Sequence, residues 1–316
     1  MKVLLTGATG FIGKSLVVAL IQQGFEVSIA VRQETSLFPN KVKQFVLGDF
    51  DDNTDFSLAL KDVDCVIHLA GKAHVIDRAE ALVLNEFRKT NTKLTLSLAR
   101  QATTAGVERF IFLSSIRVNG NQSNKAFLET DIPNPQEPYA VSKYEAEQGL
   151  LELAENSSLN IVIIRPPLVY GKDAPGNFGR LIKWINAKIV LPLPLGSIHN
   201  SRSLVAIDNL VSFIITCVTH PKAINEVFLI SDGDSLSTTQ LLKNIAKAFN
   251  KKALLLPIPA SWMIFMAKIL GKKADAIRLF SSLVVDSSKA NKLLNWYPVV
   301  TMNEQLRQIA EISTKR

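Results

Sequence analysis

Three side chains in the middle of the chain are of types that can exchange a proton with an alcohol or a ketone. Tyr139 and Lys143 lie four residues apart in 138–156, a segment with helical apolar spacing, so both side chains should share one helix face. A lysine ammonium beside a phenol favours the phenolate and lets the tyrosine exchange a proton near neutral pH. Ser115 ends the apolar run 109–115, where its hydroxyl could hold the reacting oxygen. Together these three candidate catalytic residues predict hydride-transfer chemistry at a carbinol or ketone carbon.

The N-terminal segment TGATGFIG predicts the partner for that chemistry. Gly7, Gly10 and Gly13 follow a short apolar run and open a segment with helical spacing. The first glycine permits a tight turn, the second lets the backbone approach a pyrophosphate, and the third allows close packing of helix on sheet. The helix N-terminus then offers free N–H groups to phosphates. We expect a nicotinamide dinucleotide here, in contact with the three glycines and with Phe11 and Ile12.

The end of the second expected strand bears on the choice of nicotinamide cofactor. Arg32 stands where an NAD-preferring site usually carries an acid for the ribose 2′-hydroxyl, and it could instead pair with a 2′-phosphate. This favours NADP(H). NAD(H) remains the alternative, because Glu34 could play the acid while Arg32 stacks on the adenine or points to solvent. Asp49, after the third strand, is placed to cap the adenine edge.

The residues named above lie in or beside helices and strands that are expected to alternate along the first half of the chain. Helical patterns at 11–24, 85–106 and 138–156 separate apolar runs, which are expected strands at 3–7, 26–31, 43–49, 65–71, 109–115 and 160–166. Strands that are apolar throughout indicate a parallel sheet covered on both faces. The expected fold is therefore α/β, a doubly wound parallel sheet (Rossmann) with a smaller C-terminal substrate lobe.

The domain boundary is predicted after Arg165, where the alternation of strand and helix patterns stops and a Pro/Gly-rich loop begins. We expect an NAD(P)-binding Rossmann domain over 1–165 and a substrate-binding lobe over 166–316, with part of 203–232 returning to the sheet. Ala70 and Gly71, which end the fourth strand, are expected to pass close to the cofactor. His74 follows and is a candidate substrate contact.

Composition excludes several classes of protein. The 316 residues are 47% apolar and 20% charged, which argues against intrinsic disorder. The net charge of +8 suits an anionic partner, yet the chain has no nucleic-acid module, so a small phosphorylated ligand explains it as well. No His/Cys/Asp cluster has metal spacing.

Location is suggested by what the sequence lacks. Two cysteines make no disulfide framework, which fits a reducing compartment. The apolar run at the N-terminus is too short for a signal peptide, and no segment predicts a spanning helix. Residues 253–270 come nearest, with a buried amphipathic helix favoured over a peripheral membrane face. We expect a cytoplasmic protein without an integral membrane segment.

The order and spacing of several motifs resemble the extended short-chain dehydrogenase/reductase family over essentially the whole chain. These motifs are TGATGFIG, HLAG, FIFLSS, PYAVSK, RPPLVYG and RSLVAIDNL. The resemblance is closest to the nucleotide-sugar epimerase/dehydratase/reductase branch, which includes UDP-glucose 4-epimerase-like proteins and O-antigen 4-ketoreductases that form UDP-N-acetylquinovosamine.

This resemblance implies roles for individual residues. Tyr139 would be the acid/base, Ser115 the partner of the substrate oxygen, and Lys143 the ribose anchor. Ser114 and Pro166 would lie beside the nicotinamide. Further candidates are substrate contacts, namely Arg202 for a diphosphate, which a guanidinium suits, and Asn177.

Two departures from the branch concern the substrate. Pro167-Leu168 stands where epimerases often carry an asparagine, and the later Arg-x-Gly-Asp element is missing, so that either Arg278 substitutes for it or nothing does. An acid after the catalytic serine, typical of 4,6-dehydratases, is replaced by Ile116 and Arg117, which argues against dehydration.

The sequence thus favours a reductase or dehydrogenase acting at C4 of a UDP-linked sugar, in surface polysaccharide or O-antigen biosynthesis. The first alternative is a UDP-sugar 4-epimerase with tightly bound NAD. A non-catalytic NADP-binding sensor and a reductase of a non-sugar ketone are further alternatives. The helices over 85–106 and 138–156 are expected to pair two copies into a homodimer.

Overall fold

The computed structural model describes residues 1–73, 80–187, 192–269, 271 and 273–314. Within them, seven parallel strands form one sheet in the order β3-β2-β1-β4-β5-β6-β9. These strands are β1 (Lys2–Thr6), β2 (Glu26–Val31), β3 (Lys43–Val46), β4 (Cys65–His68), β5 (Arg109–Leu113), β6 (Asn160–Arg165) and β9 (Glu226–Leu229). The strand order reverses between β1 and β4, the place where open α/β sheets bind ligands. The predicted doubly wound fold is confirmed.

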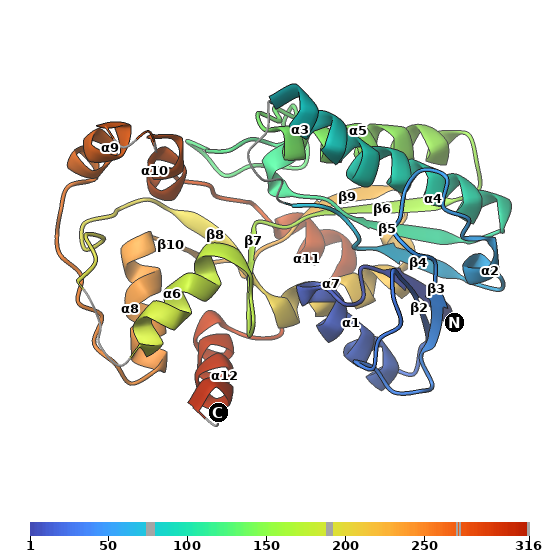
Figure 1. Cartoon of the computed structure of the whole chain (residues 1–316), viewed down its shortest axis with the longest axis horizontal. Helices are drawn as coiled ribbons and strands as arrows, with labels where there is room; N and C mark the ends of the chain where they lie inside the picture. Colours follow the sequence, from blue (N-terminus) through green and yellow to red (C-terminus); the bar gives the residue numbers. More distant parts are fainter. Residues whose placement is uncertain (74–79, 188–191, 270, 272, 315–316) are drawn as a thin grey trace.

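Helices cover both faces of the sheet (Figure 1). One face packs against α1 (Phe11–Gln22), α7 (Ile207–Thr219) and α11 (Ser288–Leu294) in a continuous apolar core. The other packs against α2 (Ser57–Leu60), α4 (Leu94–Thr104) and α5 (Pro138–Glu155). Because both faces are covered, every residue of β4 is buried, and so is every residue of β6 after the first. This burial explains the apolar runs in both strands.

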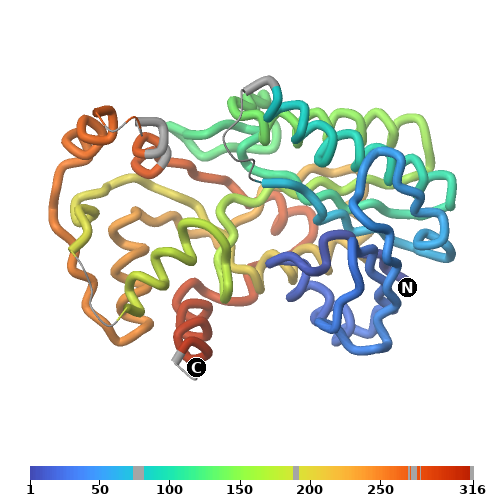
Figure 2. Tube along the Cα trace, in the orientation of Figure 1, coloured from blue at the N-terminus to red at the C-terminus, as the bar shows by residue number. Residues whose placement is uncertain are grey.

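A smaller lobe follows β6. Its sheet has the order β10-β8-β7, with β7 (Leu168–Tyr170) parallel and β10 (Ser235–Leu236) antiparallel to β8 (Arg202–Ala206). The lobe's helices are α6 (Gly176–Asn186), α8 (Thr238–Ala248), α9 (Ala260–Ile269), α10 (Lys273–Phe280) and α12 (Met302–Thr314). The chain leaves the lobe after β8, supplies α7 and β9 to the larger sheet, and then returns (Figure 2).

The expected long helix over 85–106 differs in the structure. It consists of α3 (Glu80–Phe87), a π-helical stretch over Arg88–Lys93, and α4. Asn91 lies inside the π-helical stretch and is fully buried, and its side chain bonds both backbone polar groups of Lys72 at 2.8 and 3.0 Å. The wider turn brings that amide inward against the end of β4, a common use of π-helical turns at functional sites.

Candidate active site

Ser115, Tyr139 and Lys143 meet at the carboxyl end of β5. Tyr139 lies in the first turn of α5, close to the side chain of Ser115, whose hydroxyl favours the phenolate form. One turn later, the Nζ of Lys143 donates to the Leu113 carbonyl at 2.9 Å and lies 4.4 Å from the centre of the Phe112 ring. The helix spacing thus aims phenol and ammonium at the same strand end.

Burial and nearby charges shift the pKa values of Tyr139 and Lys143 in opposite directions. Partial burial raises the pKa of Tyr139, while the positive charge of Arg117 and the Ser115 hydrogen bond lower it. Burial lowers the pKa of Lys143 to about 8, against the opposing effect of the Glu147 carboxylate. Lys143 is only 4% exposed, so its charge lies in a medium of low dielectric constant. Its electrostatic interactions with nearby groups are therefore stronger than they would be in water.

The turn at Gly7, Gly10 and Gly13 leaves a space beside the backbone, here called the cradle, which larger side chains at these positions would fill. Gly7 has a φ of +75°, and a Cβ there would lie 2.7 Å from the backbone nitrogen of Ala70. A Cβ on Gly13 would lie 2.2 Å from the Gly7 carbonyl oxygen. Gly10 precedes α1, whose N-terminus has no side-chain cap and no acid in its first turn. Those N–H groups suit a pyrophosphate, and Phe11 and Ile12 open the same helix.

The opposite wall of the cradle comes from the ends of β4, β5 and β6. Gly71 faces Lys143, because a Cβ on this glycine would lie 3.3 Å from the lysine Nζ. Pro166 is buried, and its carbonyl accepts from the backbone of Ile116 at 3.0 Å, beside Ser115. The hydroxyl of Ser114 is buried, and among the described residues it has no hydrogen-bond partner. An open cradle and an unpaired hydroxyl fit a nicotinamide dinucleotide.

Arg32 and Asp49, predicted for the adenosine end, are neighbours. They form an ion pair of 3.7 Å at the ends of β2 and β3, with side chains 73% and 93% exposed. Such an exposed pair contributes little to stability, so Arg32 is available to a ligand.

On the substrate side, Arg202 begins β8 and donates to the Ser281 carbonyl at 3.3 Å. Burial and the nearby charge of Arg117 lower the pKa of Arg202. A cavity of about 540 Å³ adjoins it, lined by Ser201, Ser281, Ser282, Val284 and residues 122–126. The positive charge of Arg117 therefore acts on both the tyrosine and the predicted diphosphate contact.

Other predicted substrate contacts are less well placed or not described. Asn177 lies exposed in the first turn of α6, and no described contact joins it to Arg202. His74 falls outside the described residues, as does the side chain of Arg278.

Two polar residues of the site were not assigned from sequence. Arg117 is half-buried and pairs with Glu137, the residue that precedes α5. Asn91 donates to Ser142 at 3.1 Å, and its Oδ1 would lie 3.1 Å from a Cβ on Gly71. A cation two residues after Ser115 was a usable signal for Arg117, whereas Asn91 depends on a π-helical turn that no pattern predicted.

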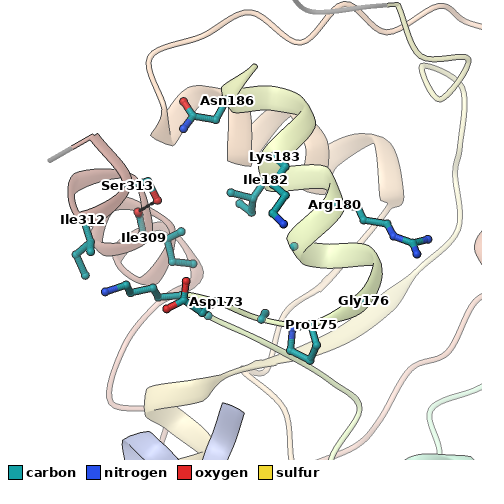
Figure 3. A pocket seen from close by; sticks show the side chains of 14 residues that line it. Asp173, Pro175, Gly176, Arg180, Ile182, Lys183, Asn186, Ile309, Ile312 and Ser313 are labelled. Atoms are coloured by element: carbon teal, nitrogen blue, oxygen red, sulfur yellow. Dashed lines mark hydrogen bonds between the residues drawn. The ribbon is translucent and has the colours of Figure 1, made fainter. Parts of the chain in front are cut away.

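A second cavity, of about 570 Å³, lies elsewhere. Figure 3 shows it between α6 and α12, with labelled side chains from both helices and from the loop after β7. Neither the serine–tyrosine–lysine cluster nor Arg202 lines it. Among the described residues, no cluster of three His, Cys, Asp or Glu side chains could hold a metal ion. The described helices also include none that is long and apolar enough to cross a bilayer.

Comparisons with known proteins agree with this geometry. A family model described as "NAD dependent epimerase/dehydratase family" matches residues 3–231. A Vibrio cholerae protein named "UDP-glucose 4-epimerase" is 42% identical, covering 98% of this chain and 94% of that protein. An Escherichia coli O157:H7 protein named "N-acetyl-alpha-D-glucosaminyl-diphospho-ditrans,octacis-undecaprenol 4-epimerase" is 28% identical, with coverage of 86% and 82%. The solved UDP-glucuronic acid 4-epimerase from Bacillus cereus, in complex with NAD, has a TM-score of 0.78 at 25% identity, with coverage of 98% and 96%.

Proposed function

The chain belongs to the NAD dependent epimerase/dehydratase family, and from that premise we propose that it interconverts the two C4 epimers of a UDP-linked sugar. The observation that carries the proposal is the 42% identity, over nearly the full length of both chains, to the Vibrio cholerae protein named as a UDP-glucose 4-epimerase. The relatives support this alternative better than the 4-keto reductase that Arg32 favours in the sequence.

Residues around the cradle would hold the cofactor. Gly7, Gly10 and Gly13 leave room for its pyrophosphate, and Ser114 offers an unpaired hydroxyl on the nicotinamide side. A bound nicotinamide supplies a hydride acceptor and donor for C4. We propose that Lys143 anchors the ribose and stabilises negative charge on the phenol.

Proton transfer falls to Tyr139. Its phenolate takes the proton of the C4 hydroxyl as the C4 hydride departs, which leaves a ketone. Ser115 holds that oxygen. The keto sugar then rotates in the site, so that the opposite face of C4 receives the hydride. Tyr139 returns the proton to the C4 oxygen. The net change is inversion at C4, with no gain or loss of atoms or electrons.

Arg202 is the proposed anchor for the diphosphate. A guanidinium can donate two parallel hydrogen bonds to phosphate oxygens, so it can hold the nucleotide while the sugar turns. Its neighbour Ser201 and its hydrogen-bond partner Ser281 line the cavity of about 540 Å³, and the charge of Arg117 acts on its guanidinium.

The test supplies UDP-glucose and UDP-N-acetylglucosamine separately to protein purified without added cofactor, and follows the sugar proton signals by NMR. Formation of the galacto epimer without added NAD(H) is expected, and Tyr139→Phe should lower the rate by about 10²–10⁴-fold. Tyr144→Phe, five residues further along α5, is the matched control and should retain the rate. Failure of the wild-type protein to form the epimer of either sugar contradicts the proposal for these substrates.

A second candidate, a 4-keto-sugar reductase, is favoured by the exposed Arg32 at the end of β2. A reductase must exchange its cofactor, and NADPH is the usual donor. Tighter binding of NADPH than of NADH to stripped protein, reduced about tenfold by Arg32→Ala, would support it. Retention of stoichiometric NAD through purification would count against it.

A further inference from the structure

Helix α9 has two apolar faces. Its inner face packs against the lobe's core through Ala260 and Met263, both partly buried. The sequence ASWMIFMAKI has no residue that is fully buried in the structure. A helix whose apolar residues surround it would normally be covered on both sides.

The outer face of α9 is a continuous apolar stripe. Trp262, Phe265, Met266 and Ile269 are 71%, 62%, 52% and 64% exposed. Their spacing of i, i+3, i+4 and i+7 places all four on one side of the helix. Exposed apolar groupings of this size mark interaction surfaces, whereas isolated apolar residues do not.

The charge of this region narrows the choice of partner. Residues 251–273 contain five lysines and no aspartate or glutamate; the lysines are Lys251, Lys252, Lys268, Lys272 and Lys273. Two copies meeting through this segment would bring like charges together. An anionic surface would instead attract this basic segment, although Lys251 itself is engaged with the Asn186 and Ala187 carbonyls.

We propose that α9 is a membrane-docking helix, which lies in the interface of an anionic phospholipid bilayer with its outer stripe inserted between the headgroups. Tryptophan prefers this boundary, because its ring is apolar and its N–H is polar. Lys268, exposed in the last turn of the same helix, would meet the lipid phosphates. At 10 residues the helix is too short to span the bilayer, so it lies in the surface.

Docking through α9 would place the smaller lobe against the bilayer. The helix packs beside α10, and both lie at the end of the molecule that the smaller lobe forms, away from β2 and β3 (Figure 1). Ser281, the residue after α10, has the carbonyl that accepts a hydrogen bond from Arg202. One helix therefore separates the proposed lipid contact from the proposed diphosphate contact.

The experiment mixes the full chain with vesicles of phosphatidylglycerol and phosphatidylcholine, or of phosphatidylcholine alone, and measures co-flotation at low and high salt. Binding to the phosphatidylglycerol vesicles is expected, weakening at high salt as the charges are screened. The double variant Trp262→Glu/Phe265→Glu should reduce binding at least tenfold. Leu58→Glu is the matched control, since Leu58 is 77% exposed on the distant α2, and it should bind like wild type.

Further readouts protect the test from a folding artefact and from self-association. Quenching of tryptophan fluorescence by brominated lipid should occur in wild type and be lost in Trp262→Phe, which should still float. Three results would each overturn the proposal: wild type that does not float with anionic vesicles, equal loss of binding in the Leu58→Glu control, or flotation unchanged in the double variant. A dimer that dissociates in the double variant, without vesicle binding by wild type, would assign the stripe to a second copy.

Discussion

Replacing Lys143 by methionine should stabilise the ligand-free protein near neutral pH. Burial lowers the pKa of this lysine from 10.5 to about 8. At 1.36 kcal/mol per pKa unit, the buried charge costs the folded state about 3 kcal/mol. Methionine has similar length and no charge, but it loses the hydrogen bond to the Leu113 carbonyl, worth about 1 kcal/mol. The expected net gain is about 2 kcal/mol at pH 7.

This gain should disappear at alkaline pH. The folded protein releases the Lys143 proton near pH 8, whereas the unfolded chain holds it until about pH 10.5. Between these values the unfolded state binds more protons, so the lysine's contribution to stability rises with pH. Below pH 8 both states are charged and the penalty is complete.

Urea unfolding of nucleotide-stripped protein, at intervals from pH 7 to 10.5, measures the effect. Other titrating groups cancel in the difference between wild type and variant. Lys61→Met, at an exposed lysine, is the control and should show a difference near zero throughout. A difference between wild type and Lys143→Met that stays constant across this range would refute the reasoning. The same variant should lose at least about 10²-fold in kcat/KM, since the lysine supports the phenolate.

Three further predictions concern the rest of the site. Glu147→Gln should cost about 3–5 kcal/mol in urea unfolding, because it leaves the Arg165 guanidinium buried without its carboxylate partner, now 2.5 Å away; a loss below about 1 kcal/mol would contradict this. Gly13→Ala should abolish retention of nucleotide through purification, since its Cβ would collide with backbone of the glycine turn; a variant that keeps wild-type nucleotide content would argue against the cradle. Arg117→Met should shift the acid limb of the pH–rate profile for oxidation to higher pH, because loss of the positive charge raises the pKa of Tyr139; Arg117→Lys should restore the limb, and an unmoved limb in Arg117→Met would exclude the coupling.

Local spacing was enough for the fold and for the core of the candidate site. The glycine turn, the Tyr139–Lys143 pair and the apolar strands each depend on residues only a few positions apart in the chain. Local backbone geometry therefore determines which residue types can stand at those positions. The parallel sheet was therefore predictable, and it is confirmed. The roles of the individual site residues, the preference for NADP(H) and the homodimer stay predictions.

Tertiary structure decided what depends on residues far apart in the chain. Arg117 and Arg202 are 85 positions apart, and their charges come together because residues 123–127 and 201–203 both pair with the segment 282–285. The Lys143 pKa depends on burial by the strand ends and on Glu147. In the sequence, α9 suggested a buried helix, yet the lobe covers one of its faces and leaves the other to solvent. Sequence spacing determines which side chains share a face, whereas long-range packing determines which faces and charges meet.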